Sequence, residues 1–480
     1  MIRLFLLCLV VFVAGCDQPT TTEQVRHDQP TAIEQVRPDQ LSFPKLEFTF
    51  PTVETTQLTN GMRLYFMADH ELPLVEMTLM IDGGSIYDPL DKTGLSDLFA
   101  AVLETGGAGD LSPKQLESEL ESMAAELSVS GSSYDYSVDL SLHQQDLQRG
   151  VEILADLLRR PRFDSDRLEL ARQQLLEAIR RQNDDPDQVS SRLLAEAVFP
   201  NHPFGLTPQT ETVKTFTRED LQNLQKECLQ PQNIWIAVSG DVDKAQLIAL
   251  LEENLGDWKA TTVTRKQIPA LPPVPKGKVL VAEKDVPQTS IKLGHPGISK
   301  DNPDFFALRV ANYILGGGGF NSRMMREIRS NRGLAYSVYS YFQIGRRLPE
   351  LFIAGSETKC STTYEVVALM RQLMEQMRDE PVSEEELQLA KQSLINSFVF
   401  AFSDIHSVVS RKMRLDYFDY PDDYLETYRD NLAAVTIADV QRVARRYLHP
   451  DQLQIVLVGD SRLFAGALEG FGLPVEKVEL

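Results

Sequence analysis

An internal duplication is the feature that most constrains how this chain can fold. Two stretches of the sequence match without a gap when one is displaced by 219 residues. The first runs through Thr217, Pro231 and Gly240, and the second through Thr436, Pro450 and Gly459. In each stretch, a threonine followed three residues later by an aspartate predicts a helix start, and an apolar run ending in Gly-Asp predicts a strand. Seven or more matched positions at one spacing indicate two copies of one domain.

Hydrophobic periodicity predicts further strands and helices in both halves. Strands are predicted at 62–68, 74–82, 134–142, 278–282, 290–295 and 334–342. Helices are predicted at 163–182, 303–315, 362–377 and 383–398. Ser383 and Glu386 have the spacing of a capping box at the start of the last of these helices. Taken alone, this periodicity predicts the α+β class.

A chain of 480 residues is too long for one hydrophobic core, so several domains are expected. The stretch at 269–275 is rich in proline and has the composition of a linker. We therefore predict an N-terminal domain at 46–265, a linker at 266–276 and a C-terminal domain at 277–480.

The first fifteen residues have the pattern of a secretory signal peptide. Arg3 supplies the positive start, and the apolar run at 4–13 is too short to span a bilayer as a mature helix. Ala14-Gly15-Cys16 is similar to a bacterial lipobox, in which the cysteine becomes the lipidated first residue; an incidental cysteine at an ordinary cleavage site is the alternative. A lipid on Cys16 predicts a body in the periplasm, anchored to a membrane of the cell envelope. Asp17 is similar to the signal for retention in the inner membrane.

Residues 16–45 differ in composition from the rest of the chain. Polar residues and proline predominate, and an eleven-residue pattern that begins at Asp17 recurs at Asp28. Such a segment has too little apolar surface to fold alone, so we predict a disordered tether with a reach of roughly 30 Å. An eleven-residue period can also indicate a helical supercoil, but prolines interrupt both copies.

Charge and cysteine content exclude some classes of function. The net charge of −21 argues against a nucleic-acid partner, because the phosphate backbone would repel the chain. Cys228 and Cys360 lie one in each predicted domain and could pair only if the fold made them adjacent. We expect both to be small buried hydrophobic side chains. The seven histidines never occur three or four residues apart, so no histidine pair on one helix face indicates a metal site.

The segment that follows Gly94 reads Leu-Ser-Asp-Leu-Phe-Ala-Ala. It resembles the metal-binding helix of the pitrilysin, insulinase and mitochondrial processing peptidase family. In that family, a Gly-Leu step opens a helix that carries His-x-x-Glu-His, with both imidazoles on one helix face and the glutamate beside the metal-bound water. The resemblance aligns the two histidines and the glutamate with Asp97, Ala101 and Ala100. These metal positions are therefore degenerate in this chain.

The family's third zinc ligand, a glutamate on a later helix, aligns with Ala178. The resemblance therefore implies no metal or other cofactor in this chain. Asp97 and Glu104 could share one helix face, but two carboxylates without an imidazole make a weak zinc site. Solvated or capping carboxylates are the simpler interpretation of both residues.

The second half contains the segment Leu315-Gly-Gly-Gly-Gly-Phe-Asn-Ser-Arg323, followed by Arg332-Gly-Leu-Ala-Tyr336. Both segments resemble the same family, in which the glycine-rich turn is structural and the Arg and Tyr face the zinc site across a chamber. The resemblance covers roughly residues 50–480. It implies two homologous α+β domains, each with helices packed on one face of a mostly antiparallel sheet. It also implies that Arg332 and Tyr336 bind substrate; a surface arginine and a half-buried strand tyrosine are the alternative. The glycine run lacks the residues that complete a nucleotide-binding loop.

In one bacterial branch of this family, a zinc-bearing chain pairs with a chain that lacks zinc but carries the Arg and Tyr. This sequence is similar to the second kind of chain. We therefore expect the non-zinc subunit of a cell-envelope peptidase, whose partners are a zinc-bearing homologous subunit and a peptide substrate. A catalytically inert binding or assembly lipoprotein that has kept only the fold is the second hypothesis. An active metalloprotease with an unrecognised site is the third.

Overall fold

The computed structural model describes residues 50–261 and 267–480. The predicted signal peptide, the lipidation site Cys16 and the predicted tether lie outside the described residues. The chain from Phe48 onwards forms one compact unit that contains both predicted domains. Within the described residues, no helix is both long and apolar enough to cross a membrane.

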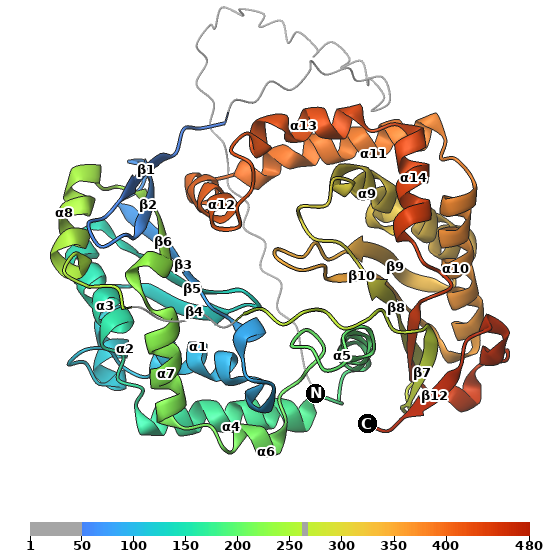
Figure 1. The fold of residues 1–480 in the computed structure, drawn as a ribbon, viewed down its shortest axis with the longest axis horizontal. Coiled ribbons are helices and arrows are strands. Elements are labelled where there is room, and N and C mark those ends of the chain that lie inside the picture. Colours follow the sequence, from blue (N-terminus) through green and yellow to red (C-terminus); the bar gives the residue numbers. More distant parts are fainter. Residues whose placement is uncertain (1–49, 262–266) are drawn as a thin grey trace, which may run out of the picture. The chain divides into compact units, whose positions relative to one another are not determined.

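The first half of the described chain forms a six-stranded sheet with the order β1-β2-β6-β3-β5-β4 (Figure 1). Its strands are β1 (Glu54–Gln57), β2 (Arg63–Ala68), β3 (Leu74–Asp82), β4 (Glu126–Gly131), β5 (Asp135–His143) and β6 (Ile234–Gly240). Only β2 and β6 run parallel in this sheet, and the other neighbouring strands are antiparallel. The prediction of a mostly antiparallel sheet is therefore confirmed here.

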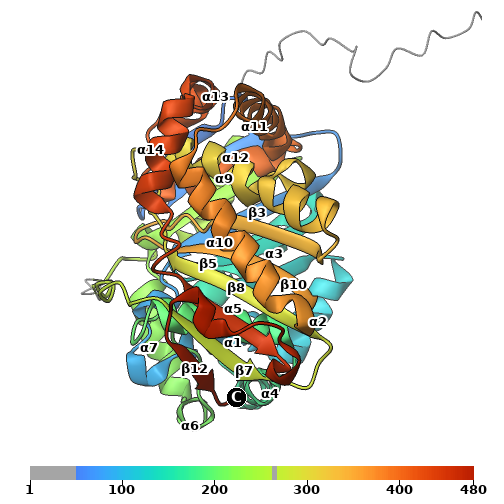
Figure 2. The same cartoon turned by 90° about the vertical axis from the view of Figure 1, so that its right-hand side faces the viewer.

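The second half forms another six-stranded sheet with the order β12-β7-β11-β8-β10-β9. Its strands are β7 (Lys278–Glu283), β8 (Gln288–Pro296), β9 (Ala335–Phe342), β10 (Leu351–Lys359), β11 (Gln454–Gly459) and β12 (Val475–Val478). The strand β7 pairs in parallel with β11 and β12, and the remaining pairs are antiparallel. In Figure 2, helix α10 (Thr363–Asp379) lies across this sheet, where it contacts β8 and β10.

The predicted duplication is confirmed in three dimensions. The strands β6 and β11, which end the two copies of the sequence repeat, occupy the same position in their sheets. Strand β6 lies between β2, to which it is parallel, and β3, to which it is antiparallel. In the same way, β11 lies between β7, to which it is parallel, and β8, to which it is antiparallel. The helices before them, α7 (Arg218–Cys228) and α14 (Ile437–Tyr447), begin with capping boxes at Thr217 and Thr436.

Each sheet has one face covered by helices of its own half. In the first half these include α1 (Leu95–Thr105), α2 (Pro113–Ser122), α3 (Leu147–Arg159), α4 (Ser165–Arg181), α6 (Thr210–Val213), α7 and α8 (Lys244–Leu255). In the second half they include α9 (Phe305–Asn312), α10, α11 (Glu384–Ser397), α13 (Tyr424–Ala434) and α14. Each layer encloses its own hydrophobic core, so the predicted two-domain α+β fold is confirmed. Cys228 and Cys360 are both buried, as predicted.

The halves also exchange one helix each, which the sequence did not indicate. Helix α5 (Pro186–Val198) of the first half packs on β8 and β11 of the second sheet, with Val189 and Leu194 against Val456. Helix α12 (Ile405–Tyr417) of the second half packs on β2 and β6 of the first sheet, with Val409 and Met413 beside Ala237. Central strands are therefore covered on both faces, which explains why β11 is buried along its whole length.

Candidate functional site

Helix α1 begins where the sequence predicts it, immediately after Gly94. Gly94 has φ +92°, a left-handed conformation that glycine adopts without strain. The carboxylate of Asp88 accepts hydrogen bonds from the backbone N–H of Gly94 (3.1 Å) and Ser96 (3.2 Å) and from the Ser96 hydroxyl (2.5 Å). These bonds satisfy N–H groups at the start of the helix, although burial raises the pKa of Asp88 to about 6.

A depression of about 480 Å³ lies beside α1 and contains three of the four degenerate metal positions. Asp97, Ala100 and Ala101 line it, because residues three and four apart share a helix face. Strand β4 contributes Val129, Ser130 and Gly131, and α4 contributes Arg167, Leu170, Ala171 and Gln174. Ala178 is exposed on α4, four residues after Gln174, and is not among the lining residues.

The side chains of this depression do not fit a zinc ion. It contains alanine methyl groups at the positions of one histidine ligand (Ala101) and of the catalytic glutamate (Ala100), and none of its lining side chains is an imidazole. Glu104 accepts a hydrogen bond from the backbone N–H of Val129 at 2.8 Å, so its carboxylate holds β4. Burial raises the pKa of Asp97. Across residues 50–261 and 267–480, no group of three or more His, Cys, Asp or Glu side chains is arranged to hold a metal.

The glycine-rich segment of the second half forms a π-helix, Tyr313–Gly317, directly after α9. A Cβ atom on Gly316 would lie 2.4 Å from the Oγ of Ser340 and 2.5 Å from its backbone N, so only glycine permits this contact with β9. Ser322-Arg323 leads into a second π-helix, Met325–Asn331. Arg323 donates two hydrogen bonds of 2.7 Å to the carboxylate of Glu386. Burial alone would raise the pKa of Glu386, but the hydrogen bonds and the positive charge of Arg323 outweigh this effect and lower the pKa to about 2. The Arg323–Glu386 ion pair therefore connects helix α11 to the segment that lies beside β9.

Arg332 and Tyr336 lie on either side of the junction between the second π-helix and β9. The Nε of Arg332 donates to Glu327 at 2.8 Å, and a terminal nitrogen donates to Glu365 at 3.4 Å. Tyr336 is 81% exposed. Within the described part of the chain, its hydroxyl has no hydrogen-bond partner. Tyr336 therefore has a phenolic donor available for a ligand.

Two further residues beside Tyr336 were not indicated by the sequence analysis. The guanidinium carbon of Arg329 lies 4.3 Å from the centre of the Tyr336 ring and 4.6 Å from that of Phe320. Phe320 is 63% exposed, so the three side chains form an exposed cation–π stack. Their order along the chain carries no recognised motif, and only the fold brings Phe320 to Arg329.

A groove of about 640 Å³ runs beside β9, the outermost strand of the second sheet. Ser337, Val338, Tyr339, Ser340, Tyr341 and Phe342 line it from β9, and Gly316, Gly317 and Gly319 line it from the glycine-rich segment. An outermost strand has backbone donors and acceptors on one side that can pair with an extended peptide.

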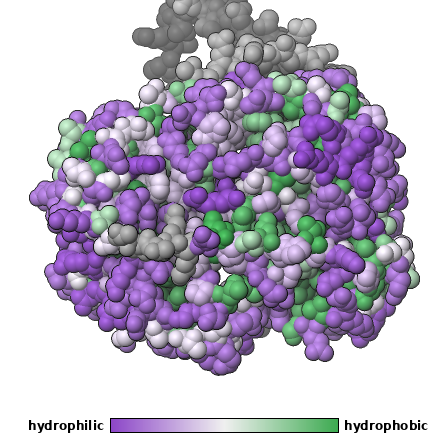
Figure 3. Space-filling model, in the orientation of Figure 1, coloured by the Kyte–Doolittle hydropathy of each residue, from purple (hydrophilic) through white to green (hydrophobic). Residues whose placement is uncertain are grey.

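Figure 3 shows a molecular face on which hydrophilic residues predominate, in keeping with the net charge of −21.

Comparison with known proteins identifies two matching segments. Residues 66–208 match the family described as Insulinase (Peptidase family M16), and residues 215–394 match the one described as Peptidase M16 inactive domain. The protein named non-peptidase homolog YmxG, from Helicobacter pylori, is 25% identical over 398 residues, which cover 82% of this chain and 91% of that protein. The mitochondrial-processing peptidase subunit beta of Blastocladiella emersonii is 26% identical over 437 residues, which cover 87% and 91% of the two chains.

A solved structure supports the same fold. The crystal structure of a peptidase M16 inactive domain from Pseudomonas fluorescens has a TM-score of 0.77 to this chain, at 23% sequence identity. The match covers 85% of this chain and 98% of that one. At this level of identity the likeness shows the fold alone.

Proposed function

This chain belongs to the insulinase family of peptidases (peptidase family M16), and we propose that it serves as the non-zinc subunit of a two-chain peptidase. It is an inactive peptidase-like protein: residues 215–394 match a domain described as inactive, and one relative is named a non-peptidase homolog. In the proposed assembly, a homologous partner binds zinc and hydrolyses the peptide, and this chain contributes residues that bind it.

The observation that carries the proposal is the contrast between the two halves. The first half has Asp97, Ala100 and Ala101 where the family binds metal, so its own depression cannot hold zinc. The second half keeps Arg332 and Tyr336 at the end of an unpaired strand edge, and the Tyr336 hydroxyl is exposed. A protein that needed only the fold would have no use for this exposed donor.

The chemistry of the two residues suits a peptide. Asn312 and Met325 already bond the backbone of Ser340 and Val338. An extended peptide would therefore pair with β9 near Tyr336, whose hydroxyl would donate a hydrogen bond to a carbonyl oxygen of that peptide. Arg332 carries a permanent positive charge, and Glu327 and Glu365 hold its guanidinium in place. The remaining N–H groups of Arg332 would donate to a peptide carbonyl or carboxylate.

The proposed location is the cell envelope, with a lipid on Cys16 and the body in the periplasm. Its basis is the signal-like sequence at 1–15 and the lipobox-like order Ala14-Gly15-Cys16. The inner membrane is the proposed site because Asp17 follows the cysteine.

Co-purification and reconstitution test the function. The tagged full-length chain, isolated from its native cells under mild conditions, should bring with it a homologous chain that carries His-x-x-Glu-His. The mixture should hydrolyse a peptide library, and neither chain alone should do so at a comparable rate. Isolation of this chain without any zinc-bearing homologue, from cells that express one, would contradict the pairing.

A second candidate is an assembly protein that has kept only the peptidase fold. The ion pairs of Arg332 with Glu327 and Glu365 favour it, because they would also serve a purely structural role. This candidate predicts a stable complex whose activity does not depend on Arg332 or Tyr336.

A further inference from the structure

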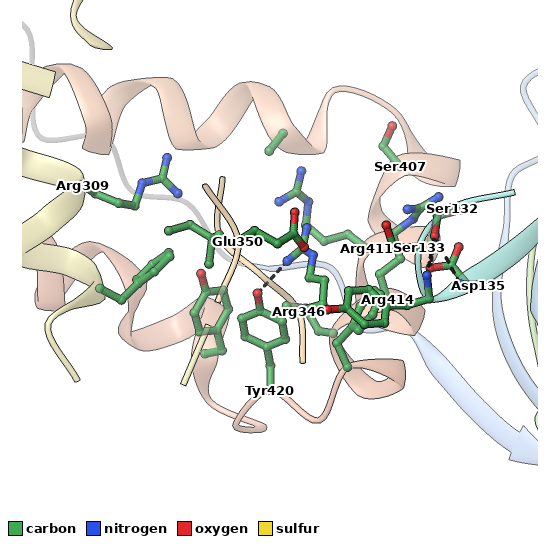
Figure 4. Close-up of a pocket in the computed structure, with 18 of the residues that line it drawn as sticks. Ser132, Ser133, Asp135, Arg309, Arg346, Glu350, Ser407, Arg411, Arg414 and Tyr420 are labelled. Atoms are coloured by element: carbon green, nitrogen blue, oxygen red, sulfur yellow. Dashed lines mark hydrogen bonds between the residues drawn. The ribbon is translucent and has the colours of Figure 1, made fainter. Parts of the chain in front are cut away.

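A second cavity, distinct from the Arg332–Tyr336 group, lies where segments of both halves meet (Figure 4). Its volume is about 880 Å³, within the range of pockets that bind drug-sized ligands. The first half contributes the turn between β4 and β5, and the second half contributes α9, the β9–β10 connection, α12 and α13. The lining residues used below are Asp135, Arg309, Arg346, Glu350, Phe400, Ser410, Arg411, Arg414, Phe418 and Tyr420.

Positive charge is concentrated in this cavity although the whole chain is acidic. Four arginines line it, against the two carboxylates Asp135 and Glu350. Figure 4 shows Arg309 on one side and Arg411 and Arg414 on the other, with Arg346 between them. Burial raises the pKa of Glu350 to about 7, so this carboxyl cancels only part of the positive charge at neutral pH. The whole chain has a net charge of −21, so the sign of this cluster is opposite to that of the molecule as a whole.

None of the four arginines forms an ion pair within residues 50–261 and 267–480, although Arg346 and Arg414 lie close enough to Asp135 to oppose the rise that burial causes in its pKa. Arg411 instead lies over the ring of Phe402, with 5.2 Å between its guanidinium carbon and the ring centre. Burial lowers the pKa of Arg411, and the neighbouring Arg346 and Arg414 lower it further. Arg411 is partly buried and would gain most from an added anion, because an unpaired charge that is shielded from water is costly, and the exposed Arg414 adds a second positive charge beside it.

A buried hydroxyl gives an independent indication of a ligand. Ser410 is among the residues that line the cavity, and its buried Oγ atom has no hydrogen-bond partner among the described residues. Buried polar atoms are rarely left without a partner in folded proteins. Ser410 immediately precedes Arg411 on α12, so one ligand could reach both the hydroxyl and the guanidinium group.

We propose that this cavity binds an acidic peptide segment, whose carboxylates pair with Arg411 and Arg414 while its apolar side chains pack on Phe400 and Phe418. Planar guanidinium groups suit carboxylates, and the aromatic lining suits the rest of a peptide. Phe400 is 80% exposed and would lose this exposure to water. A compact polyanion such as phosphate is disfavoured, because the carboxyl groups of Asp135 and Glu350 also line the cavity and would repel it. The site shares no residue with Arg332 and Tyr336 and requires no partner chain.

Calorimetric titration of the purified full-length chain tests the proposal. The probes are N-acetyl-Phe-Glu-Glu with a free carboxyl terminus, its neutral counterpart N-acetyl-Phe-Gln-Gln-amide, and inorganic phosphate. The acidic peptide should bind, and both other probes should bind at least tenfold more weakly. Arg411→Gln combined with Arg414→Gln should weaken binding of the acidic peptide by more than tenfold, because two charged hydrogen-bonding groups are lost.

Two further variants separate binding from folding. Lys412→Gln removes one positive charge from the same helix, but Lys412 pairs with Asp416 at 2.7 Å and does not line the cavity. It should change the affinity by less than about twofold. Ser410→Ala should weaken peptide binding several-fold while leaving the urea midpoint unchanged, since its hydroxyl has no protein partner to lose. Three results would overturn the proposal: no detectable binding of the acidic peptide, equal binding of the neutral peptide or phosphate, or undiminished binding by the folded double arginine variant.

Discussion

The hydroxyl of Tyr417, on the exchanged helix α12, lies 3.1 Å from the carboxylate of Asp82 at the end of β3 and 2.8 Å from the carbonyl oxygen of Tyr134. The bond joins residues from the two halves of the chain, and all of these groups are buried. Near the start of the same helix, His406 lies 2.9 Å from both the Thr78 and the Ser239 hydroxyls of the first sheet. The exchange of helices is therefore fixed by polar contacts as well as by the apolar packing of Val409 and Met413.

Tyr417→Phe is predicted to lower the free energy of unfolding by about 1–3 kcal/mol, because the buried Asp82 carboxylate and Tyr134 carbonyl lose the one donor that they share. Urea denaturation followed by circular dichroism measures the change. The control is Tyr336→Phe, whose hydroxyl is exposed and should leave the unfolding midpoint unaltered. Equal stability of Tyr417→Phe and the unmodified chain would show that the hydrogen bond does not support the exchange.

Tyr336→Phe is predicted to lower the turnover of the reconstituted pair on the order of a hundredfold, the usual effect of losing one donor to the transition state. Arg332→Ala should also raise the Michaelis constant, because a charged hydrogen bond to the bound peptide is lost. The matched control is Arg326→Ala on the preceding helix, which should retain activity. Full activity of an assembled Arg332→Ala, Tyr336→Phe double variant would favour the assembly protein instead.

The purified chain is predicted to hold no stoichiometric zinc, because Ala101 and Ala178 provide no ligand atoms at two of the three ligand positions. Asp97→His with Ala101→His should create a weak site, since residues four apart share a helix face. Adding Ala178→Glu tests whether this exposed position of α4 reaches the depression, in which case zinc should bind more tightly. Elemental analysis measures the zinc content of the unmodified chain, and zinc titration measures the affinity of the variants. Close to one tightly held zinc in the unmodified chain would contradict the prediction.

Stability should fall as the pH is lowered through the range from 6.5 to 4, and His295 should account for part of this loss. Burial lowers the pKa of His295 to about 4 from 6.5, and the ring lies 4.8 Å from Phe352 with its Nδ1 2.8 Å from the Pro296 carbonyl oxygen. The unfolded chain therefore binds more protons than the folded chain in this range, which favours unfolding. The loss reaches about 3 kcal/mol at pH 4. Urea unfolding at pH 7.5, 6 and 5 should show a shallower dependence for His295→Gln; an identical slope would exclude this role.

Cys16→Ser is predicted to release the protein from membranes, because the lipid on Cys16 is its proposed anchor. Fractionation of cells that express the variant should find a folded protein in the soluble envelope fraction. Retention on the membrane after a high-salt wash would indicate a second membrane-binding surface.

Much of the fold could be predicted because its signals are local. The strand predicted at 74–82 is β3 with the same bounds, and Ser383 and Glu386 form the predicted capping box. The helix predicted at 303–315 is shorter, because α9 ends at Asn312 and the glycine-rich segment continues as a π-helix. Only the packing of Gly316 against Ser340 explains that change, and the sequence does not reveal the contact. The uninterrupted apolar run of β11 was a signal for a strand buried on both faces, although it did not say which helix would cover it.

The sequence by itself determined the duplication, many of the strands and helices of each half, and the loss of the metal ligands. These properties follow from residue identity and short-range periodicity, which do not depend on distant parts of the chain. The tertiary structure alone decided the exchange of α5 and α12, the stack of Phe320, Arg329 and Tyr336, and the cavity around Arg411. Each of these brings together side chains far apart in the sequence, and their meeting depends on how whole layers pack. Arg411 and Arg414 lie on α12, so they reach this cavity only because α12 packs on the sheet of the other half.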